Sequence, residues 1–151
     1  MKLNEIQDMN PMFSGMAESS LSYLDSIARD VQVVKDETVF RVNDPADRLY
    51  IVSSGTLALR ITGPSRPSFT IQTLGEGSLV GLSWRFAPYR WQWTCQAVED
   101  SDLTAFDANE ILSACEQDPQ LDADLWQVVA RESARRLHNV RLQLLDVYGK
   151  G

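Results

Sequence analysis

Short apolar segments separated by turn residues fill the region between residues 31 and 106. The alternation is clearest within residues 57–61, where Leu57, Leu59 and Ile61 are interleaved with smaller or polar residues, because side chains two apart on a strand face the same side. Glycine, proline, asparagine and aspartate fill the breaks, as turns require. The pattern predicts eight strands, over residues 31–34, 39–42, 49–52, 57–61, 69–74, 79–80, 93–98 and 103–106.

Helical spacing replaces this pattern on both sides of the strands. Residues 18–28 carry apolar side chains at helical intervals behind the Ser19–Ser20 pair, which can cap the amides of a first turn. After the strands, Asp107 is a suitable N-cap for a helix over residues 108–116. Pro119 suits the start of a second helix, since first-turn amides have no partner within the helix. We therefore expect a mainly β protein with flanking helices.

The last helix carries a repeat with intervals of four and three residues, which is the spacing of a coiled-coil seam. Its members are Trp126, Ala130, Ser133, Leu137, Val140, Leu144 and Val147. The repeat covers about three heptads, the lower limit for a coiled coil. A helix that packs on its own barrel has a similar stripe, so the period alone leaves a dimer interface and an internal packing face as alternatives.

Composition narrows the classes of function. The 151 residues make about one domain, and a net charge of −7 works against broad attraction to nucleic acid or anionic lipid. The N-terminus lacks the apolar run of a signal peptide, and no apolar run is long enough to cross a bilayer, so we expect a cytoplasmic protein without membrane association. Cys95 and Cys115 are expected to be reduced and partly buried.

Known catalytic patterns have no counterpart in the sequence. One histidine and two cysteines offer no metal-ligand spacing. A hydrolase triad has no basis without a nucleophile elbow, and the Gly75-Glu76-Gly77 turn lacks the Lys-Ser/Thr of a P-loop. We expect neither an enzyme nor a metal site.

The order of these elements resembles a known family. The match includes the spacing of the strands, the Gly75-Glu76-Gly77 turn that leads to Gly81, and Ala134-Arg135-Arg136-Leu137 on the long helix. Over about residues 18–149 the chain is similar to the cyclic-nucleotide-binding domain family, in particular the effector-binding half of Crp/Fnr-type regulators. The resemblance implies a regulatory sensor, built as a cyclic-nucleotide-binding-like β-roll (a double-stranded β-helix or jelly roll).

The resemblance also implies how the chain is divided. Residues 18–119 are expected to form the β-roll with its short helices, preceded by a mobile arm over 1–17 and followed by a dimerisation helix over 120–151. In the family a winged helix-turn-helix follows this helix, whereas here the chain ends at Gly151. With an acidic balance and no basic recognition helix, direct contact with nucleic acid is not expected.

The family's nucleotide pocket is altered in this sequence. In the family a glycine and backbone amides approach the cyclic phosphate, a glutamate holds the ribose hydroxyl and an arginine neutralises the phosphate. Gly81 matches the glycine, but Leu82 stands at the glutamate position and Trp91 at the arginine position. Arg90 precedes Trp91, and neighbouring side chains on a strand face opposite ways, so a bend in the loop is needed to aim Arg90 inward.

The changes predict weak binding of cAMP in the usual mode, because each charged hydrogen bond contributes about 1.5–3 kcal/mol. The family's base-contacting positions on the long helix hold Val140 and Arg141. In their place, residues 84–93 carry three tryptophans beside Arg85 and Arg90, and such groups can stack a planar ligand and hold an anion. The candidate ligand-binding residues are Gly81, Leu82, Ser83, Arg90, Trp91, Gln92, Trp93 and Arg141.

Three interpretations of the altered pocket stay open. The first is a non-enzymatic sensor, homodimeric through the last helix, that binds a small planar or anionic ligand or has lost cAMP binding. The second is an adaptor whose tryptophans close the pocket while the aromatic loop docks on a protein partner. The third is conventional binding of cAMP or cGMP through Arg90. No cofactor is certain beyond this possible cyclic nucleotide or other small ligand.

Overall fold

The structure, a computed structural model, describes residues 13–63 and 66–148, with side chains described outside residues 62–68 and 147–148. Most of the expected mobile arm therefore lies outside the described residues. Its described end is packed, since Phe13 and Met16 are buried in the main hydrophobic core. The arm thus contributes at least these two side chains to the folded domain.

Two four-stranded sheets form the β-roll, and every pairing in them is antiparallel. One sheet has the order β1-β8-β3-β6 and the other β2-β7-β4-β5. The strands of the described residues overlap all eight segments expected from the apolar pattern. They are β1 (Arg29–Val33), β2 (Thr38–Phe40), β3 (Arg48–Ser54), β4 (Leu57–Gly63), β5 (Arg66–Leu74), β6 (Leu79–Val80), β7 (Thr94–Ala97) and β8 (Ser101–Asp107).

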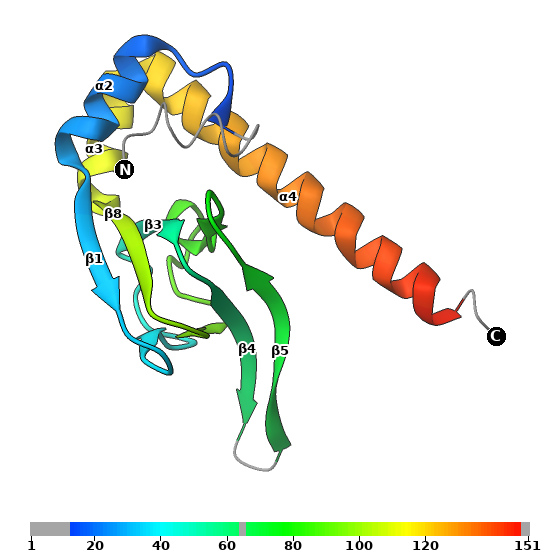
Figure 1. Ribbon diagram of the computed structural model, residues 1–151. Coiled ribbons are helices and arrows are strands. Elements are labelled where there is room, and N and C mark those ends of the chain that lie inside the picture. Colours follow the sequence, from blue (N-terminus) through cyan, green and yellow to red (C-terminus); the bar gives the residue numbers. More distant parts are fainter. Residues whose placement is uncertain (1–12, 64–65, 149–151) are drawn as a thin grey trace.

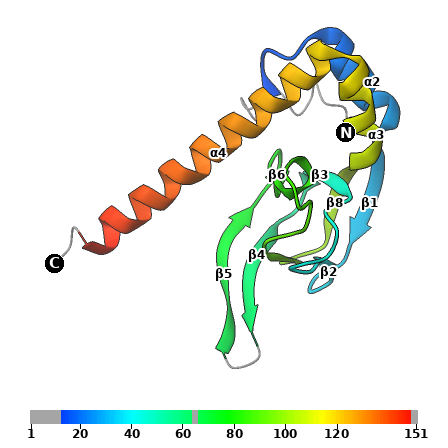
Figure 2. The same cartoon turned by 180° about the vertical axis from the view of Figure 1, so that it is seen from behind.

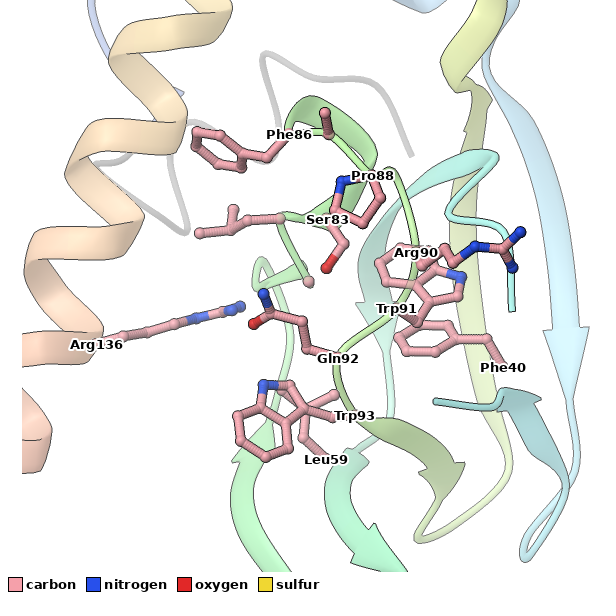
Figure 3. A pocket seen from close by; sticks show the side chains of 13 residues that line it. Phe40, Leu59, Ser83, Phe86, Pro88, Arg90, Trp91, Gln92, Trp93 and Arg136 are labelled. Carbon is pink, nitrogen blue, oxygen red and sulfur yellow. The ribbon is translucent and has the colours of Figure 1, made fainter. Parts of the chain in front are cut away.

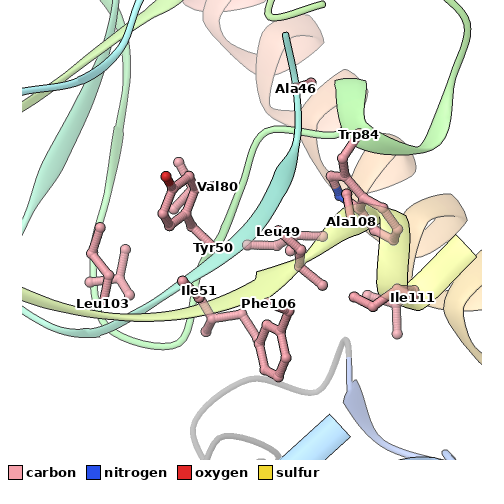
Figure 4. Packing of buried hydrophobic residues seen from close by; sticks show 14 of the residues in the cluster. Ala46, Leu49, Tyr50, Ile51, Val80, Trp84, Leu103, Phe106, Ala108 and Ile111 are labelled. Atoms are coloured by element: carbon pink, nitrogen blue, oxygen red, sulfur yellow. The ribbon is translucent and has the colours of Figure 1, made fainter. Parts of the chain in front are cut away.

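Strand β3 shows how the core is built on both sides of a sheet. Its residues 49–52 are all buried. Tyr50 faces the stacked ring of Phe40 inside the roll, with the ring centroids 6.2 Å apart. Leu49 lies on the other side, towards Ile111 of helix α3 (Ala108–Gln117; Figure 4). A continuous apolar run, rather than an alternating one, is what a strand buried on both faces requires.

Within the described residues, the α-helices that flank the sheets are α2 (Glu18–Ile27), α3 (Ala108–Gln117) and α4 (Pro119–Tyr148). The expected cap at Asp107 and the expected helix start at Pro119 are both confirmed. The Asp107 carboxylate accepts from the amide of Glu110 at 3.0 Å, and the Asp118 carboxylate accepts from the first amides of α4. The cap expected from Ser19 and Ser20 is wrong, because α2 begins after Ala17 without a side-chain cap.

A carboxylate from α4 takes over the polar groups at the start of α2. Asp124, which is buried, accepts from the amide of Ala17 at 3.0 Å and from the Ser20 hydroxyl at 2.7 Å. Its other oxygen accepts from the side-chain amide of Gln120 at 2.9 Å. This network fastens α2 to the beginning of α4, where Figure 1 shows the two helices side by side.

Helix α4 has two apolar faces. Its C-terminal part extends past the barrel (Figures 1 and 2). One face packs on the domain through Leu121, Leu125, Val128 and Val129, which are all buried. The expected seam is a different face: its members Trp126, Ala130, Ser133, Leu137, Val140 and Leu144 are exposed, and the side chain of Val147 lies outside the described residues. The alternative of a seam packed on its own barrel is therefore wrong.

We expect Asp124→Ala to lower the free energy of unfolding by about 1.5–3 kcal/mol, because it leaves the buried Ser20 hydroxyl and the Ala17 amide without an acceptor. Urea denaturation followed by circular dichroism measures the change. Glu116→Ala, at an exposed carboxylate on α3, is the matched control and is expected to be nearly neutral. Equal effects of the two substitutions would contradict the role of Asp124.

Candidate functional site

A cavity of about 330 Å³ opens between the roll, the loop that joins β6 to β7, and helix α4 (Figure 3). It lies at the small end of the range of about 300–1,000 Å³ that is usual for small-molecule sites. Seven of the eight residues expected at the ligand site line it. The full lining is Phe40, Leu59, Gly81, Leu82, Ser83, Phe86, Ala87, Pro88, Arg90, Trp91, Gln92, Trp93 and Arg136.

The indole of Trp91 fills the space directly against Gly81. It is buried and stacks on Phe40, with centroids 3.8 Å apart and an angle of 11° between the planes. Gly81 has φ +74°, and a Cβ added there would lie 2.6 Å from Cζ3 of Trp91. Gly81 thus meets two demands at once, a left-handed backbone and close approach of a ring. The backbone beside Gly81 faces an indole rather than open cavity.

The guanidinium of Arg90 points away from Arg136 and from the centre of the cavity (Figure 3). Its Nη1 donates to the carbonyl oxygen of Asn43 at 2.7 Å, on an exposed edge where residue 90 pairs with Pro45. Figure 3 shows Arg90 extending to the side opposite Arg136. The isolated bridge to Pro45 gives this segment a locally strand-like course, in which neighbouring side chains face opposite ways, so Trp91 turns inward and Arg90 outward. Arg90 contributes to the cavity wall while its guanidinium serves the β2–β3 connection.

The remaining cassette side chains provide a mixed surface. Ser83, at the start of the 3₁₀ helix η2 (Ser83–Arg85), and Gln92 offer a hydroxyl and an amide. Trp93 lines the cavity with an indole that is 39% exposed. Leu82 is half-buried and, as expected, provides no side-chain acceptor. Polar groups that can both donate and accept therefore lie next to an accessible aromatic face.

Arg136 is the charged residue of the lining that was not among the candidates, and the other additions, Phe40, Leu59, Phe86, Ala87 and Pro88, are apolar. It lies on α4 and reaches the cavity from outside the cassette (Figure 3). Its Nε donates to Oε1 of Glu132 at 2.6 Å, and its Nη2 donates to the carbonyl oxygen of Leu79 at 2.7 Å. A signal was present in the sequence, because Arg136 belongs to the Ala134-Arg135-Arg136-Leu137 segment that carried the resemblance.

Arg141, the one expected residue from the long helix, does not line this cavity. It is exposed on α4, five residues beyond Arg136. Five residues correspond to about 500° of helical rotation, so the two side chains leave the helix in directions about 140° apart. On this wall of the cavity the long helix contributes Arg136, and a ligand contact by Arg141 stays a prediction.

The tryptophan-rich segment is divided between core, cavity wall and cavity rim. Trp84 is buried near Ala108 of α3 (Figure 4), so it belongs to the core. Arg85 is buried in an ion pair with Asp122 and lies over the ring of Trp126, 4.2 Å from its centroid. These contacts fasten η2 to α4. Of the two tryptophans that line the cavity, Trp91 is buried and Trp93 is the exposed one.

The described residues hold no cluster of three metal-ligating side chains. Burial raises the pKa of the Cys95 thiol to about 12, so it is protonated at neutral pH and is a poor nucleophile. Burial likewise raises the pKa of Tyr50, next to Phe40. Both cysteines are free and buried. Within residues 13–63 and 66–148, no helix has the length and apolar character needed to cross a membrane.

Comparison with known proteins identifies the family of domains whose fold holds this cavity. The family model described as "Cyclic nucleotide-binding domain" matches residues 30–118. A CRP-like cAMP-activated global transcriptional regulator of Mycobacterium tuberculosis is 24% identical over 149 residues, covering 98% of this chain and 66% of the regulator. The chain thus spans slightly less than two thirds of the length of that relative.

Solved structures agree with the fold. The N-terminal domain of a transcriptional regulator from Streptomyces coelicolor A3(2) is 26% identical with a TM-score of 0.70, covering 90% of this chain and 94% of that one. A cyclic nucleotide-binding domain from Methylobacillus flagellatus is 15% identical with a TM-score of 0.79, covering 95% of this chain and 84% of that one. The expected β-roll with flanking helices is confirmed.

We expect Gly81→Ala to destabilise the fold by about 2–4 kcal/mol, from the left-handed backbone and the clash with Trp91 together. Gly75→Ala is the control, because a Cβ there meets nothing within 4 Å. In the Gly81→Ala, Trp91→Leu double variant, the clash is relieved. The double variant should therefore lose less unfolding free energy, measured by urea denaturation, than the sum of the losses in the two single variants. Strict additivity would contradict the contact.

Proposed function

Because the chain belongs to the cyclic nucleotide-binding domain family, we propose that it is a non-enzymatic regulatory domain whose remodelled cavity binds a small planar or anionic ligand. One observation carries the proposal. The frame keeps a cavity of about 330 Å³, but the indole of Trp91 occupies the space against Gly81. Because the cavity is retained while the side chains of the cassette are replaced, a change of ligand is favoured over a complete loss of ligand binding.

Conventional binding of cAMP or cGMP through Arg90 is the weaker interpretation. The Arg90 guanidinium is engaged by the Asn43 carbonyl, and Leu82 offers no acceptor for a ribose hydroxyl. In the usual mode the phosphate thus lacks the arginine that would come from the cassette, and the ribose hydroxyl lacks its acceptor, and both losses weaken binding. These two losses support a ligand that makes neither contact.

A protein-docking role for the aromatic loop is the second candidate. Phe86 and Tyr89 are exposed, and exposed aromatic residues are common in protein interfaces. Phe86, however, packs edge-on against Trp126 of α4, with centroids 5.5 Å apart, so part of this surface already has a partner within the chain. The open cavity also differs from the closed pocket that an adaptor was expected to have.

The exposed seam of α4 supports a homodimer. Its large apolar members Trp126, Leu137, Val140 and Leu144 follow the heptad spacing, and all of them are exposed. A second copy of this helix offers the same stripe, which is the requirement for a symmetric pair. The proposed assembly buries the seam while leaving the packed face of α4 on its own barrel.

Thermal shift against a panel of nucleotides and planar metabolic acids tests the ligand site. A ligand at 100 times its dissociation constant adds about 2.7 kcal/mol of stability, and we expect at least one planar acid to raise Tm while cAMP does not. Trp93→Ala should remove the shift. Tyr89→Ala is the matched control, because Tyr89 belongs to the same loop and is 44% exposed but does not line the cavity. Stabilisation by no compound would refute a ligand site.

Light scattering after size exclusion tests the dimer. Leu137→Glu is expected to yield a monomer, because it puts a charge at the centre of the seam. Leu142→Glu is the matched control: Leu142 is 50% exposed, against 52% for Leu137, but helical spacing directs it about 140° away. A monomeric wild type, or dissociation by both variants alike, would be evidence against this interface.

A further inference from the structure

Arg136 presents a fixed cation to the cavity. Its Nε and Nη2 are held by Glu132 and by the carbonyl oxygen of Leu79, at 2.6 and 2.7 Å, so the plane of the guanidinium is set by two elements at once. Among the residues that the structure describes, none supplies an acceptor for Nη1. Figure 3 shows the side chain directed towards Gln92 across the cavity. A pre-oriented guanidinium loses little entropy when it binds an anion.

The charge on this wall is one positive unit. Glu132 is fully buried and accepts from both Arg135 and Arg136, so two cations share one carboxylate. The described lining contains no acidic side chain, and its other cation, Arg90, is turned to Asn43. A monoanion matches this balance, whereas a dianion leaves one negative charge unmatched in a partly enclosed space.

The other walls favour a flat ligand. Trp93 provides an accessible indole face, and Leu59 and Phe86 add apolar surface. Ser83 and Gln92 provide hydrogen-bonding groups on the cassette side. An aromatic ring gains from stacking on an indole, and a carboxylate gains from a guanidinium fork. With a cavity of about 330 Å³, both demands fit a compact molecule.

We propose that Arg136 is the anion-binding residue of this cavity, and that its ligand class is a small aromatic carboxylate with one negative charge. This inference rests on the proposed function, because it specifies the ligand of the same site. The anion site has moved from the cassette, where Trp91 fills the space beside Gly81, to the long helix. The carboxylate is held at Nη1 of Arg136 and the ring lies against Trp93.

The test uses benzoate as the probe, benzamide as its neutral analogue and phenyl phosphate as an aromatic dianion. Binding to the full chain is followed by the NMR shift of the Trp93 indole N–H and by titration. We expect benzoate to bind at millimolar concentration, and both analogues to bind more weakly. Arg136→Gln should weaken benzoate about 10- to 100-fold, as expected for loss of a charge-assisted hydrogen bond.

Matched variants separate binding from folding. Arg136→Lys keeps the charge and should recover part of the affinity. Arg141→Gln should leave it unchanged, since Arg141 is exposed on the same helix but lies outside the lining. If Arg136→Gln does not fold, as judged by circular dichroism, the comparison of benzoate with benzamide on the wild type still shows whether the site requires a negative charge on the ligand.

Several results would overturn the inference: no benzoate binding, equal binding of benzoate and benzamide, tighter binding of phenyl phosphate, or an equal loss in Arg141→Gln. The proposed function has a different failure. A panel ligand whose thermal shift is lost in Trp93→Ala but kept in Arg136→Gln would remove the role of Arg136 and leave the regulatory cavity standing. Only the absence of every ligand would remove both.

Discussion

The contact between the Trp91 indole and the backbone at Gly81 is the constraint on which the rest of the site depends. It requires a glycine with positive φ, and it is completed by the stack on Phe40. Backbone hydrogen bonds hold the same residue in register, because Trp91 donates to Asp44 and accepts from Asn43. Once this ring is buried, the space beside Gly81 is apolar and its neighbour Arg90 must face outward.

Different faces of helix α4 have three different roles. Leu121, Leu125, Val128 and Val129 bury one face against the domain, the heptad members expose a second, and Arg136 reaches the cavity. The buried Glu132 aligns Arg136, and the ion pair of Arg85 with Asp122 fastens the 3₁₀ helix η2 to the same rod. The cavity wall, the loop and the exposed seam therefore share one rigid element.

The fold followed from local pattern, and so did most of the candidate site. Eight apolar segments became eight strands, and Asp107 capped a helix as its position indicated. Seven candidate residues line one cavity because they are close in sequence, all on the segment that joins β6 to β7. Where the sequence failed, a distant group had intervened: the carboxylate of Asp124, not a serine cap, serves the start of α2.

Periodicity, turn chemistry and the order of glycines determined the β-roll, the cap of α3, the start of α4 and the altered cassette, because these are properties of neighbouring residues. Tertiary structure alone decided that the seam faces away from the barrel, that Trp91 turns inward while Arg90 turns outward, and that Arg136 rather than Arg141 reaches the cavity. These outcomes depend on the angle at which α4 crosses the roll and on which rings fill its interior. Both are set by packing between residues far apart in the chain, which no local pattern encodes.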